Sequence, residues 1–530
     1  MSAAQALYRS VSSFKQFSIE TGGLLEQEFA KNASLLDSPH VQQRELTSLV
    51  IIGASGDLSK RKIFPSLFRL FSQGYLPQRF AIVGYARSNI SLEEFKTKIV
   101  DAKLDKSFDK GAELAERFLS RVHYVKGDYK SLDDIRALGS FLEGLEAPGL
   151  ANNRLFYLAV PPGSNLRTTL AKLLAEIKAP SSDGWTRLII EPPFLMTGNS
   201  LANTLTENFT ESQVFRIDHY LGRDAVVNIL CMRFANLVFE PVWNAEYIEN
   251  IEVIFHESIG IEGHAHYFDR IGIVRDKLFT LMYMTALITM EQPVTLSQED
   301  VRNERVKVLR QMSPLSLSNV VLGQYAANGV HVGYKDEPDV APGSIVPTYV
   351  AAVLFLTSRR WAGVPFVLKV GRAMAETSAE IRVRFKKAPG FSFPISSIAT
   401  DNTIYIGIRP TEYIRVRITT KVPGLQTKLE PHFLDLTYKT QTSTKSSGSS
   451  SSSSEMAPAY DRLLLDVMHG GNQALFIRAD ELTAAWKIVK PLVEEIDDKK
   501  PVPALYPFGS MGPEAELDGL YNKFSIRAHS

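Results

Sequence analysis

The first part of the chain alternates short apolar runs with stretches of helical periodicity. Residues 47–54 and 79–87 are almost continuously apolar, which is typical of buried parallel strands, and residues 154–161 and 186–194 repeat the pattern. Between the first two runs, apolar residues recur at the i, i+3, i+4 and i+7 spacing of one helix face: Phe64, Leu67, Phe68 and Phe71. Strand alternating with helix across residues 47–194 predicts a Rossmann-like, doubly wound parallel sheet.

The pattern changes after Arg216. Residues 224–236 and 275–290 have the periodicity of helices, and the second of these stretches is strongly apolar. Several other runs in this half alternate apolar and polar residues or are rich in β-branched residues, as strands are: 251–255, 379–385, 403–408, 413–418 and 433–438. This second half is therefore expected to be an α+β domain with helices and a large, mainly antiparallel sheet.

These patterns predict the domain organisation. Residues 1–46 precede the first strand and form an N-terminal extension, residues 47–215 form the Rossmann-like domain, and residues 216–530 form the α+β domain. Within the second domain, residues 442–454 consist of nine serines with two threonines, one lysine and one glycine, a composition typical of a flexible insertion.

Composition excludes several classes of protein. Hydrophobic residues make up 45% and charged residues 22% of the chain, as in globular proteins. A net charge of +1 provides no bulk attraction to nucleic acid or to a membrane surface, and no apolar run reaches the ~20 residues that a membrane-spanning helix needs. Cys231 is the single cysteine, which rules out an intrachain disulfide and a cysteine-based metal site, and we expect no metal ion.

The N-terminus bears on the compartment. Residues 1–19 contain Arg9, Lys15 and several serines but no acidic residue. This composition is compatible with an organelle-targeting segment, mitochondrial or other, and equally with a short helix or a disordered extension. We expect a cytoplasmic protein, with an organelle as the alternative.

One stretch lies between the two halves and identifies a family. Residues 216–223 read R-I-D-H-Y-L-G-R, which resembles the substrate-binding signature R-I-D-H-Y-L-G-K of the glucose-6-phosphate dehydrogenases. Five further blocks agree in the same order: G-A-S-G-D-L at 53–58, G-Y-A-R at 84–87, F-Y-L-A-V-P-P at 156–162, Y-F-D-R-I-G-I-V-R-D at 267–276 and V-V-L-G-Q-Y at 320–325. The resemblance covers roughly residues 48–510 and implies NADP as cofactor, glucose 6-phosphate as substrate, and a role in the pentose phosphate pathway.

The candidate cofactor site begins at the G-A-S-G-D-L block, which follows a strand and opens a helix. Glycines at such a turn let the backbone approach a pyrophosphate, which the helix N-terminus stabilises. Arg87, just after the second strand, is placed to bind a ribose 2′-phosphate, with Ser55 as a hydroxyl partner, and this favours NADP over NAD. The resemblance implies the full set of cofactor-binding residues: Gly53, Ser55, Gly56, Asp57, Leu58, Lys62, Arg87, Tyr157 and Pro161.

The catalytic base of the family is not found in this chain. The resemblance implies a histidine on the helix after R-D, oriented by the aspartate that is Asp218 here. Counted from Arg275 the base position is Leu281, and counted back from Met290 it is Thr280, because the helix is one residue short of the family pattern. Neither side chain accepts a proton at neutral pH, and losing a positioned base costs about 10²–10⁴-fold in rate. A loop histidine, His264 or His266, is the alternative base.

The substrate residues implied by the resemblance are only partly present. His219 and Tyr220 are kept, Arg223 stands where the family has a lysine, and Arg372 keeps one of two cations near the phosphate while Thr377 replaces the other. Two acids that contact sugar hydroxyls in the family are also kept, Glu257 and Asp276. In the family's E-K-P-F block the lysine is replaced by Pro192, which has neither charge nor N–H.

These changes lead to one expectation and two alternatives. We expect a glucose-6-phosphate dehydrogenase family protein that keeps NADP binding but is catalytically impaired, with glucose 6-phosphate bound weakly or not at all. One alternative is an active NADP-dependent dehydrogenase that uses a substitute base. The other is a non-catalytic partner subunit or NADP sensor. Partners are expected to be a second copy of the chain or an active paralogue, joined through the large sheet, with no nucleic acid and no membrane.

Overall fold

The computed structural model describes residues 45–104, 111–146, 151–161, 166–179, 184–192, 200–261, 263, 265–388, 401–425, 428–437, 459–470 and 472–527. The chain divides into two compact units. The first comprises the residues up to Ala159, Leu173–Leu188 and Leu465–Gly471, and the second comprises Val160–Lys172, Ile189–Leu464 and Asn472–Ser530. The division that the sequence predicts at residue 216 stays a prediction.

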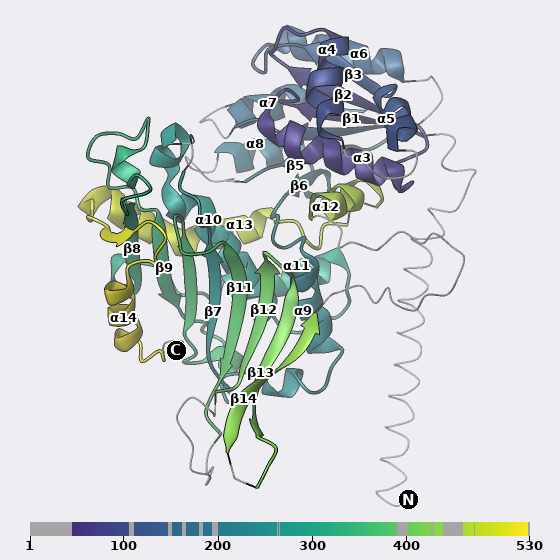
Figure 1. Cartoon of the computed structure of the whole chain (residues 1–530). Helices are drawn as coiled ribbons and strands as arrows, with labels where there is room; N and C mark the ends of the chain where they lie inside the picture. Colours follow the sequence, from purple (N-terminus) through teal and green to yellow (C-terminus); the bar gives the residue numbers. More distant parts are fainter. Residues whose placement is uncertain are drawn as a thin grey trace, which may run out of the picture. The chain divides into compact units, whose positions relative to one another are not determined.

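The N-terminal sheet has six strands in the order β3-β2-β1-β4-β5-β6 (Figure 1). β1 pairs in parallel with β2 and with β4, and β2 pairs in parallel with β3. The strands are β1 (Glu45–Ile52), β2 (Phe80–Ala86), β3 (Val122–Lys126), β4 (Ala151–Leu158), β5 (Thr186–Ile190) and β6 (Val214–Arg216). This order of parallel strands is that of the Rossmann fold and confirms the predicted sheet.

Helices follow the strands of this sheet. The predicted apolar stripe lies on α3 (Phe64–Ser72), whose Phe64, Leu67 and Phe68 are buried, and a π-helical turn at Ser59–Ile63 precedes it. The remaining helices are α4 (Leu92–Glu94), α5 (Gly111–Leu119), α6 (Leu132–Leu145), α7 (Leu166–Ala175) and α8 (Ser200–Asn208), with a second π-helical turn at Phe95–Val100. α3, α5 and α6 each bury one apolar face, which accounts for their amphipathic sequences.

The second sheet has nine strands in the order β14-β13-β12-β11-β7-β10-β9-β8-β15. The pairs β10–β7 and β15–β8 are parallel and the others are antiparallel, so the predicted mainly antiparallel sheet is confirmed. The strands are β7 (Ile248–His256), β8 (Val320–Ala326), β9 (Tyr349–Leu354), β10 (Phe366–Gly371), β11 (Ser378–Phe385), β12 (Thr403–Arg409), β13 (Tyr413–Lys421), β14 (Leu429–Thr437) and β15 (Ala504–Pro507).

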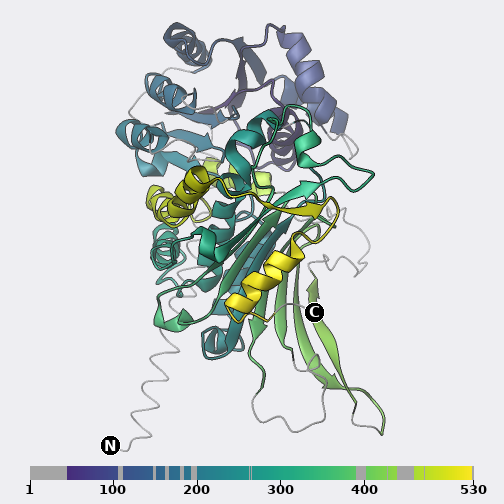
Figure 2. The same cartoon turned by 90° about the vertical axis from the view of Figure 1, so that its left-hand side faces the viewer.

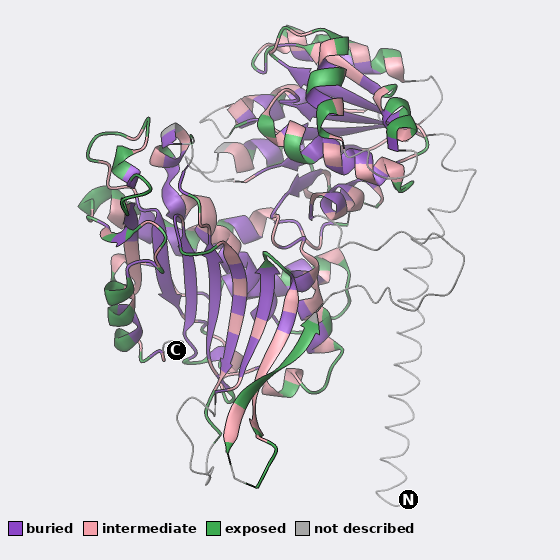
Figure 3. Ribbon diagram, in the orientation of Figure 1, coloured by how far each residue is buried: buried purple, intermediate pink, exposed green. Residues whose placement is uncertain are grey.

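The central strands of this sheet are buried, β13 is mostly half-buried, and the edge strand β14 is largely exposed (Figure 3). α10 (Ala265–Thr289) packs on β7, β9 and β10 and brings its apolar residues into the core. Within α10 the backbone of Gly272 is non-helical with φ 66°, a conformation that residues with a side chain rarely adopt, so the helix is kinked there.

The other helices of the C-terminal part are α9 (Asp224–Phe234), α11 (Gln298–Leu309), α12 (Ala459–Met468), α13 (Ala479–Lys499) and α14 (Glu514–Lys523). α14 lies across one face of the nine-stranded sheet (Figure 2). There the hydroxyl of Tyr521 donates to the buried Glu252 at 2.8 Å, and Lys369 lies 3.1 Å from the same carboxylate. This buried polar contact fixes the C-terminal helix on the sheet.

Some of the predicted segments lie outside the described residues: most of the N-terminal extension, the serine-rich insertion at residues 442–454, the end of the run 186–194, and His264. The same holds for the side chain of His266, whose backbone belongs to α10. Among the helices that the structure describes, none is both long and apolar enough to cross a membrane.

Candidate functional site

A tight turn joins β1 to the helical residues that follow it. Gly53 has φ 94°, and its N–H donates to the carbonyl of Tyr85 on β2 at 2.8 Å. The N–H of Gly56 donates back to the Gly53 carbonyl at 2.9 Å, as does the Ser59 hydroxyl at 3.1 Å. Helical residues begin at Asp57, so the N-terminal amides of a helix follow a glycine turn at the carboxyl end of a central strand. This is the geometry that binds a phosphate or pyrophosphate.

The carboxyl end of β2 brings a cation and a hydroxyl close to this turn. Ser55 and Ser88 share a hydrogen bond of 2.8 Å, which ties the turn to the end of β2. Arg87 is exposed, and its guanidinium lies 5.2 Å from the ring centroid of the buried Tyr129. Stacking on an aromatic ring restrains the guanidinium, and the residue remains exposed to solvent.

The other residues of the predicted cofactor set differ in their surroundings. Lys62 is exposed on the first helical segment, and Asp57 forms an exposed ion pair with Arg61 at 2.7 Å. Tyr157 is buried on β4, where it pairs with Ile51 of β1. Leu58 is half-buried beside Asp57, and Pro161 is exposed and belongs to the second unit.

In the second unit, Asp218 directly follows β6 and accepts three hydrogen bonds. Its Oδ1 accepts the backbone N–H groups of Tyr220 at 3.0 Å and Leu221 at 3.1 Å, which closes a turn. Its Oδ2 accepts the hydroxyl of Thr280 on α10 at 2.7 Å. Asp218 is only 4% exposed, and the three hydrogen-bond donors of its buried carboxylate all come from the chain itself. Leu281 is fully buried in the apolar core and does not reach this carboxylate.

His219 is held between two partners that sequence reasoning missed. Its Nε2 lies 3.0 Å from the Glu191 carboxylate and 3.2 Å from the Tyr460 hydroxyl, and its ring stacks on Tyr460 with centroids 4.6 Å apart. Burial raises the pKa of Tyr460 far above its usual value, and the Glu191 carboxylate adds to that shift, so the phenol stays protonated. The His219 Nδ1 is buried and has no hydrogen-bond partner among the described residues. The imidazole is therefore positioned by the chain itself.

A group of charged residues comes from the ends of β7, β10 and β12 and from α10. The Arg372 guanidinium lies 2.9 Å from one Glu257 oxygen, and Arg409 lies 3.8 Å from the other. Lys277 follows Asp276 in the chain, and its Nζ lies 3.7 Å from the Asp276 carboxylate. The Asp276 and Glu257 charges raise the pKa of Lys277 while Arg372 opposes them, with Asp276 the largest influence. Lys277 is thus a protonated cation that faces the same charges as Arg372.

Three positions differ from the family pattern, and their side chains have different surroundings. The hydroxyl of Thr377 accepts the Ser258 N–H at 2.9 Å and shares a 2.8 Å hydrogen bond with the Ser258 hydroxyl. Arg223 is the N-cap residue that precedes α9, and its guanidinium lies 3.6 Å from the Glu412 carboxylate, while Pro192 is half-buried directly after Glu191. Thr377 is therefore used in a local contact, whereas Arg223, 37% exposed, still presents a cation.

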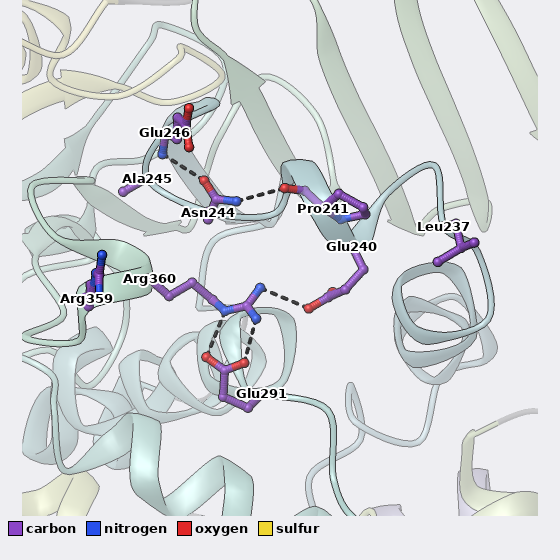
Figure 4. A pocket seen from close by; sticks show the side chains of 9 residues that line it. All are labelled: Leu237, Glu240, Pro241, Asn244, Ala245, Glu246, Glu291, Arg359 and Arg360. Carbon is purple, nitrogen blue, oxygen red and sulfur yellow. Dashed lines mark hydrogen bonds and ion pairs between the residues drawn. The ribbon is translucent and has the colours of Figure 1, made fainter. Parts of the chain in front are cut away.

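A surface pocket of about 690 Å³ lies elsewhere in the second unit and contains none of the predicted site residues (Figure 4). Its main charged groups satisfy one another: Arg360 pairs with Glu291 at 2.6 Å and with Glu240 at 2.9 Å. Because these charges are already paired, the pocket offers no unpaired polar group from this trio to a ligand.

Comparisons with known proteins agree over nearly the whole chain. Residues 50–228 match the family model "Glucose-6-phosphate dehydrogenase, NAD binding domain", and residues 230–525 match "Glucose-6-phosphate dehydrogenase, C-terminal domain". The chain is 43% identical to chloroplastic glucose-6-phosphate 1-dehydrogenase 1 of Arabidopsis thaliana, over 93% of this chain and 87% of that protein. It is 40% identical to cytoplasmic isoform 5 of the same plant, over 90% and 91% of the two chains.

Two solved structures have the same fold. A glucose-6-phosphate dehydrogenase in complex with its substrate glucose 6-phosphate superposes with a TM-score of 0.81 and 35% identity, covering 91% of this chain and 98% of that chain. A glucose-6-phosphate 1-dehydrogenase from Mycobacterium avium superposes with a TM-score of 0.76 and 28% identity, covering 92% and 98%.

Proposed function

Because the chain belongs to the glucose-6-phosphate dehydrogenase family, we propose that it binds NADP and a sugar phosphate but oxidises glucose 6-phosphate slowly or not at all. The family's reaction converts glucose 6-phosphate and NADP into 6-phosphogluconolactone and NADPH. It needs a hydride acceptor, which NADP supplies, and a base that removes the proton of the sugar's C1 hydroxyl. This chain keeps residues for the first requirement and lacks the second.

NADP binding is supported by the turn after β1 and by the end of β2. The glycine turn and the helix N-terminus suit a pyrophosphate, and NAD and NADP share that group. Only NADP carries a 2′-phosphate, and Arg87 is an exposed cation restrained over Tyr129 beside the Ser55–Ser88 hydrogen bond. An exposed guanidinium group is well suited to a phosphate, so these residues favour NADP.

Sugar-phosphate binding is supported by the charges of the second unit. His219, Tyr220, Arg223 and Arg372 are the residues that we propose bind the phosphate, and Glu257 and Asp276 the sugar hydroxyls. Two of the donors implied by the family are absent, at Pro192 and Thr377. Charge-assisted contacts contribute about 1.5–3 kcal/mol each, so losing two weakens binding by about 10²-fold or more.

One observation supports impaired catalysis: the Asp218 carboxylate accepts a hydrogen bond from the hydroxyl of Thr280. A threonine hydroxyl cannot act as a general base at neutral pH, since its lone pairs are far too weakly basic. Asp218 is itself buried and occupied by two backbone N–H groups, so it is poorly placed to replace the base. We infer that Asp218 has here the structural role of closing the turn after β6.

A role as a partner subunit has separate support. The edge strand β14 exposes three large apolar side chains: Phe433 (54%), Leu434 (58%) and Leu436 (62%). Exposed apolar residues on an unpaired sheet edge favour contact with another chain. We propose that this region contacts a second copy of the chain or an active paralogue.

Binding and turnover measured on the same preparation test the proposed function. Calorimetry with NADP, NAD and glucose 6-phosphate gives the affinities, and the rate of NADPH formation gives the turnover. We expect NADP to bind more tightly than NAD and glucose 6-phosphate to bind more weakly than about 0.1 mM, with little NADPH formed. Tighter binding of NAD would refute the cofactor assignment, and micromolar affinity for glucose 6-phosphate would refute the weakened substrate site.

A further inference from the structure

Lys277 is a cation of the second unit that has no role in the proposed function. Its side chain is 31% exposed, so its ammonium group is within reach of a ligand. The Asp276 carboxylate, at 3.7 Å, is beyond hydrogen-bond distance, and no described residue forms a hydrogen bond with the Lys277 Nζ. A protonated ammonium has three N–H donors, and here they are left for solvent or a ligand.

Lys277 changes the charge of its surroundings. Its charged neighbours include the Asp276 and Glu257 carboxylates, which attract the ammonium group, and the Arg372 guanidinium, which repels it. The Arg372 guanidinium forms an ion pair with Glu257 at 2.9 Å, but its Nε is buried without a hydrogen-bond partner among the described residues. Without Lys277, a second anionic group beside Asp276 would meet the repulsion of that carboxylate with no adjacent ammonium group to offset it.

We propose that Lys277 binds a carboxylate and thereby makes this site prefer a phosphorylated sugar acid to the neutral phosphorylated sugar. This inference rests on the proposed function, in which His219, Tyr220, Arg223 and Arg372 bind the phosphate and the acids near Lys277 contact the sugar. A carboxylate carries one negative charge, which a single ammonium group can pair. A second phosphate carries −1.5 to −2 at pH 7, which exceeds the charge of one ammonium group.

Calorimetry with two probes tests this inference on the full chain. The probes are 6-phosphogluconate, which has a phosphate and a carboxylate, and glucose 6-phosphate, which has the phosphate alone. We expect the unmodified protein to bind the acid at least about tenfold more tightly, as one charge-assisted contact allows. Lys277→Met should remove most of that advantage while changing glucose 6-phosphate affinity by less than about threefold, and Lys277→Arg should keep it.

Lys490 provides a matched control, because it is also an exposed lysine near a carboxylate, 3.5 Å from Glu494 on α13. Lys490→Met should leave both affinities unchanged, and thermal unfolding shows whether each variant folds. Equal weakening of both probes in Lys277→Met, or a sugar bisphosphate that binds more tightly than the acid, would overturn the inference. If glucose 6-phosphate binds as tightly as 6-phosphogluconate, only the proposed role of Lys277 is overturned, and the proposed sugar-phosphate site stands. Binding of neither probe overturns the proposed sugar-phosphate site as well.

Discussion

Placing a histidine at residue 280 and at residue 281 should have opposite effects. Thr280 is half-buried and its hydroxyl lies 2.7 Å from the Asp218 carboxylate, so an imidazole there can donate to the same oxygen. Leu281 is fully buried among apolar side chains, so an imidazole there has no carboxylate to orient it. Thr280→His therefore restores an oriented base, and Leu281→His introduces a polar group into the core.

The structure sets the size of both effects. Losing the burial of a leucine costs about 1.5–3 kcal/mol, and an unpaired imidazole in the core adds about 1–3 kcal/mol. Leu281→His should therefore lower the free energy of unfolding by several kcal/mol and add no activity. A positioned base is worth about 10²–10⁴-fold in rate, but groups that act as a unit recover little singly. With Pro192 and Thr377 unchanged, Thr280→His should raise kcat by less than about 10²-fold.

The assay is steady-state NADPH formation with saturating NADP, combined with urea unfolding of each variant. The triple variant Thr280→His, Pro192→Lys and Thr377→Arg should exceed the product of the three single effects. Thr377→Arg also removes the contacts with Ser258, so its own unfolding curve is needed as a control. If Leu281→His were the more active and the more stable variant, the assignment of Thr280 to the base position would be refuted.

Two further predictions concern the cofactor and pH. Arg87→Ala should weaken NADP at least about tenfold more than NAD in calorimetry, since only NADP has the 2′-phosphate, and equal weakening would contradict the assignment. Burial, with smaller effects of Lys369 and Arg382, lowers the pKa of His256 to about 3. Its unfolded value is about 6.5, so between these values the unfolded state binds the extra proton and stability falls as pH falls, by roughly 2 kcal/mol from pH 6.5 to 5. His256→Gln should flatten this dependence in urea unfolding at pH 5 and 7, whereas the exposed His331→Gln should leave it unchanged.

Much of the fold follows from local pattern. The apolar face of α3 and several of the strands β11–β14 were predictable from their periodicity. Strands β1 and β2 are continuous apolar runs, and they were predictable because they alternate with stretches of helical periodicity. Strands β9 and β10 were not predicted, although both are buried throughout. Their sequences are short apolar runs without alternation, which periodicity alone cannot distinguish from a buried helix. Only their pairing with β7 and β8 determines that they are strands.

The candidate site was less accessible to sequence reasoning. The sequence left the base position open between two residues because the helix is one residue short, and the contact that separates them comes from Asp218, 62 positions away from Thr280. Tyr460 meets His219 across 241 positions, so no local pattern indicates the stack. Lys277 had only its adjacency to Asp276 as a signal, and an exposed-looking lysine after an acid is common on helices.

The turnover of the unmodified full chain tests the central claim most directly. NADPH formation from glucose 6-phosphate and NADP should be measured alongside glucose-6-phosphate 1-dehydrogenase 1 of Arabidopsis thaliana, a 43% identical relative. The account predicts a kcat at least about 10²-fold below that of the relative, together with clear NADP binding, as the loss of a positioned base requires. A kcat within tenfold of the relative would contradict it and would point to His264 or His266 as the base, each testable by substitution with alanine.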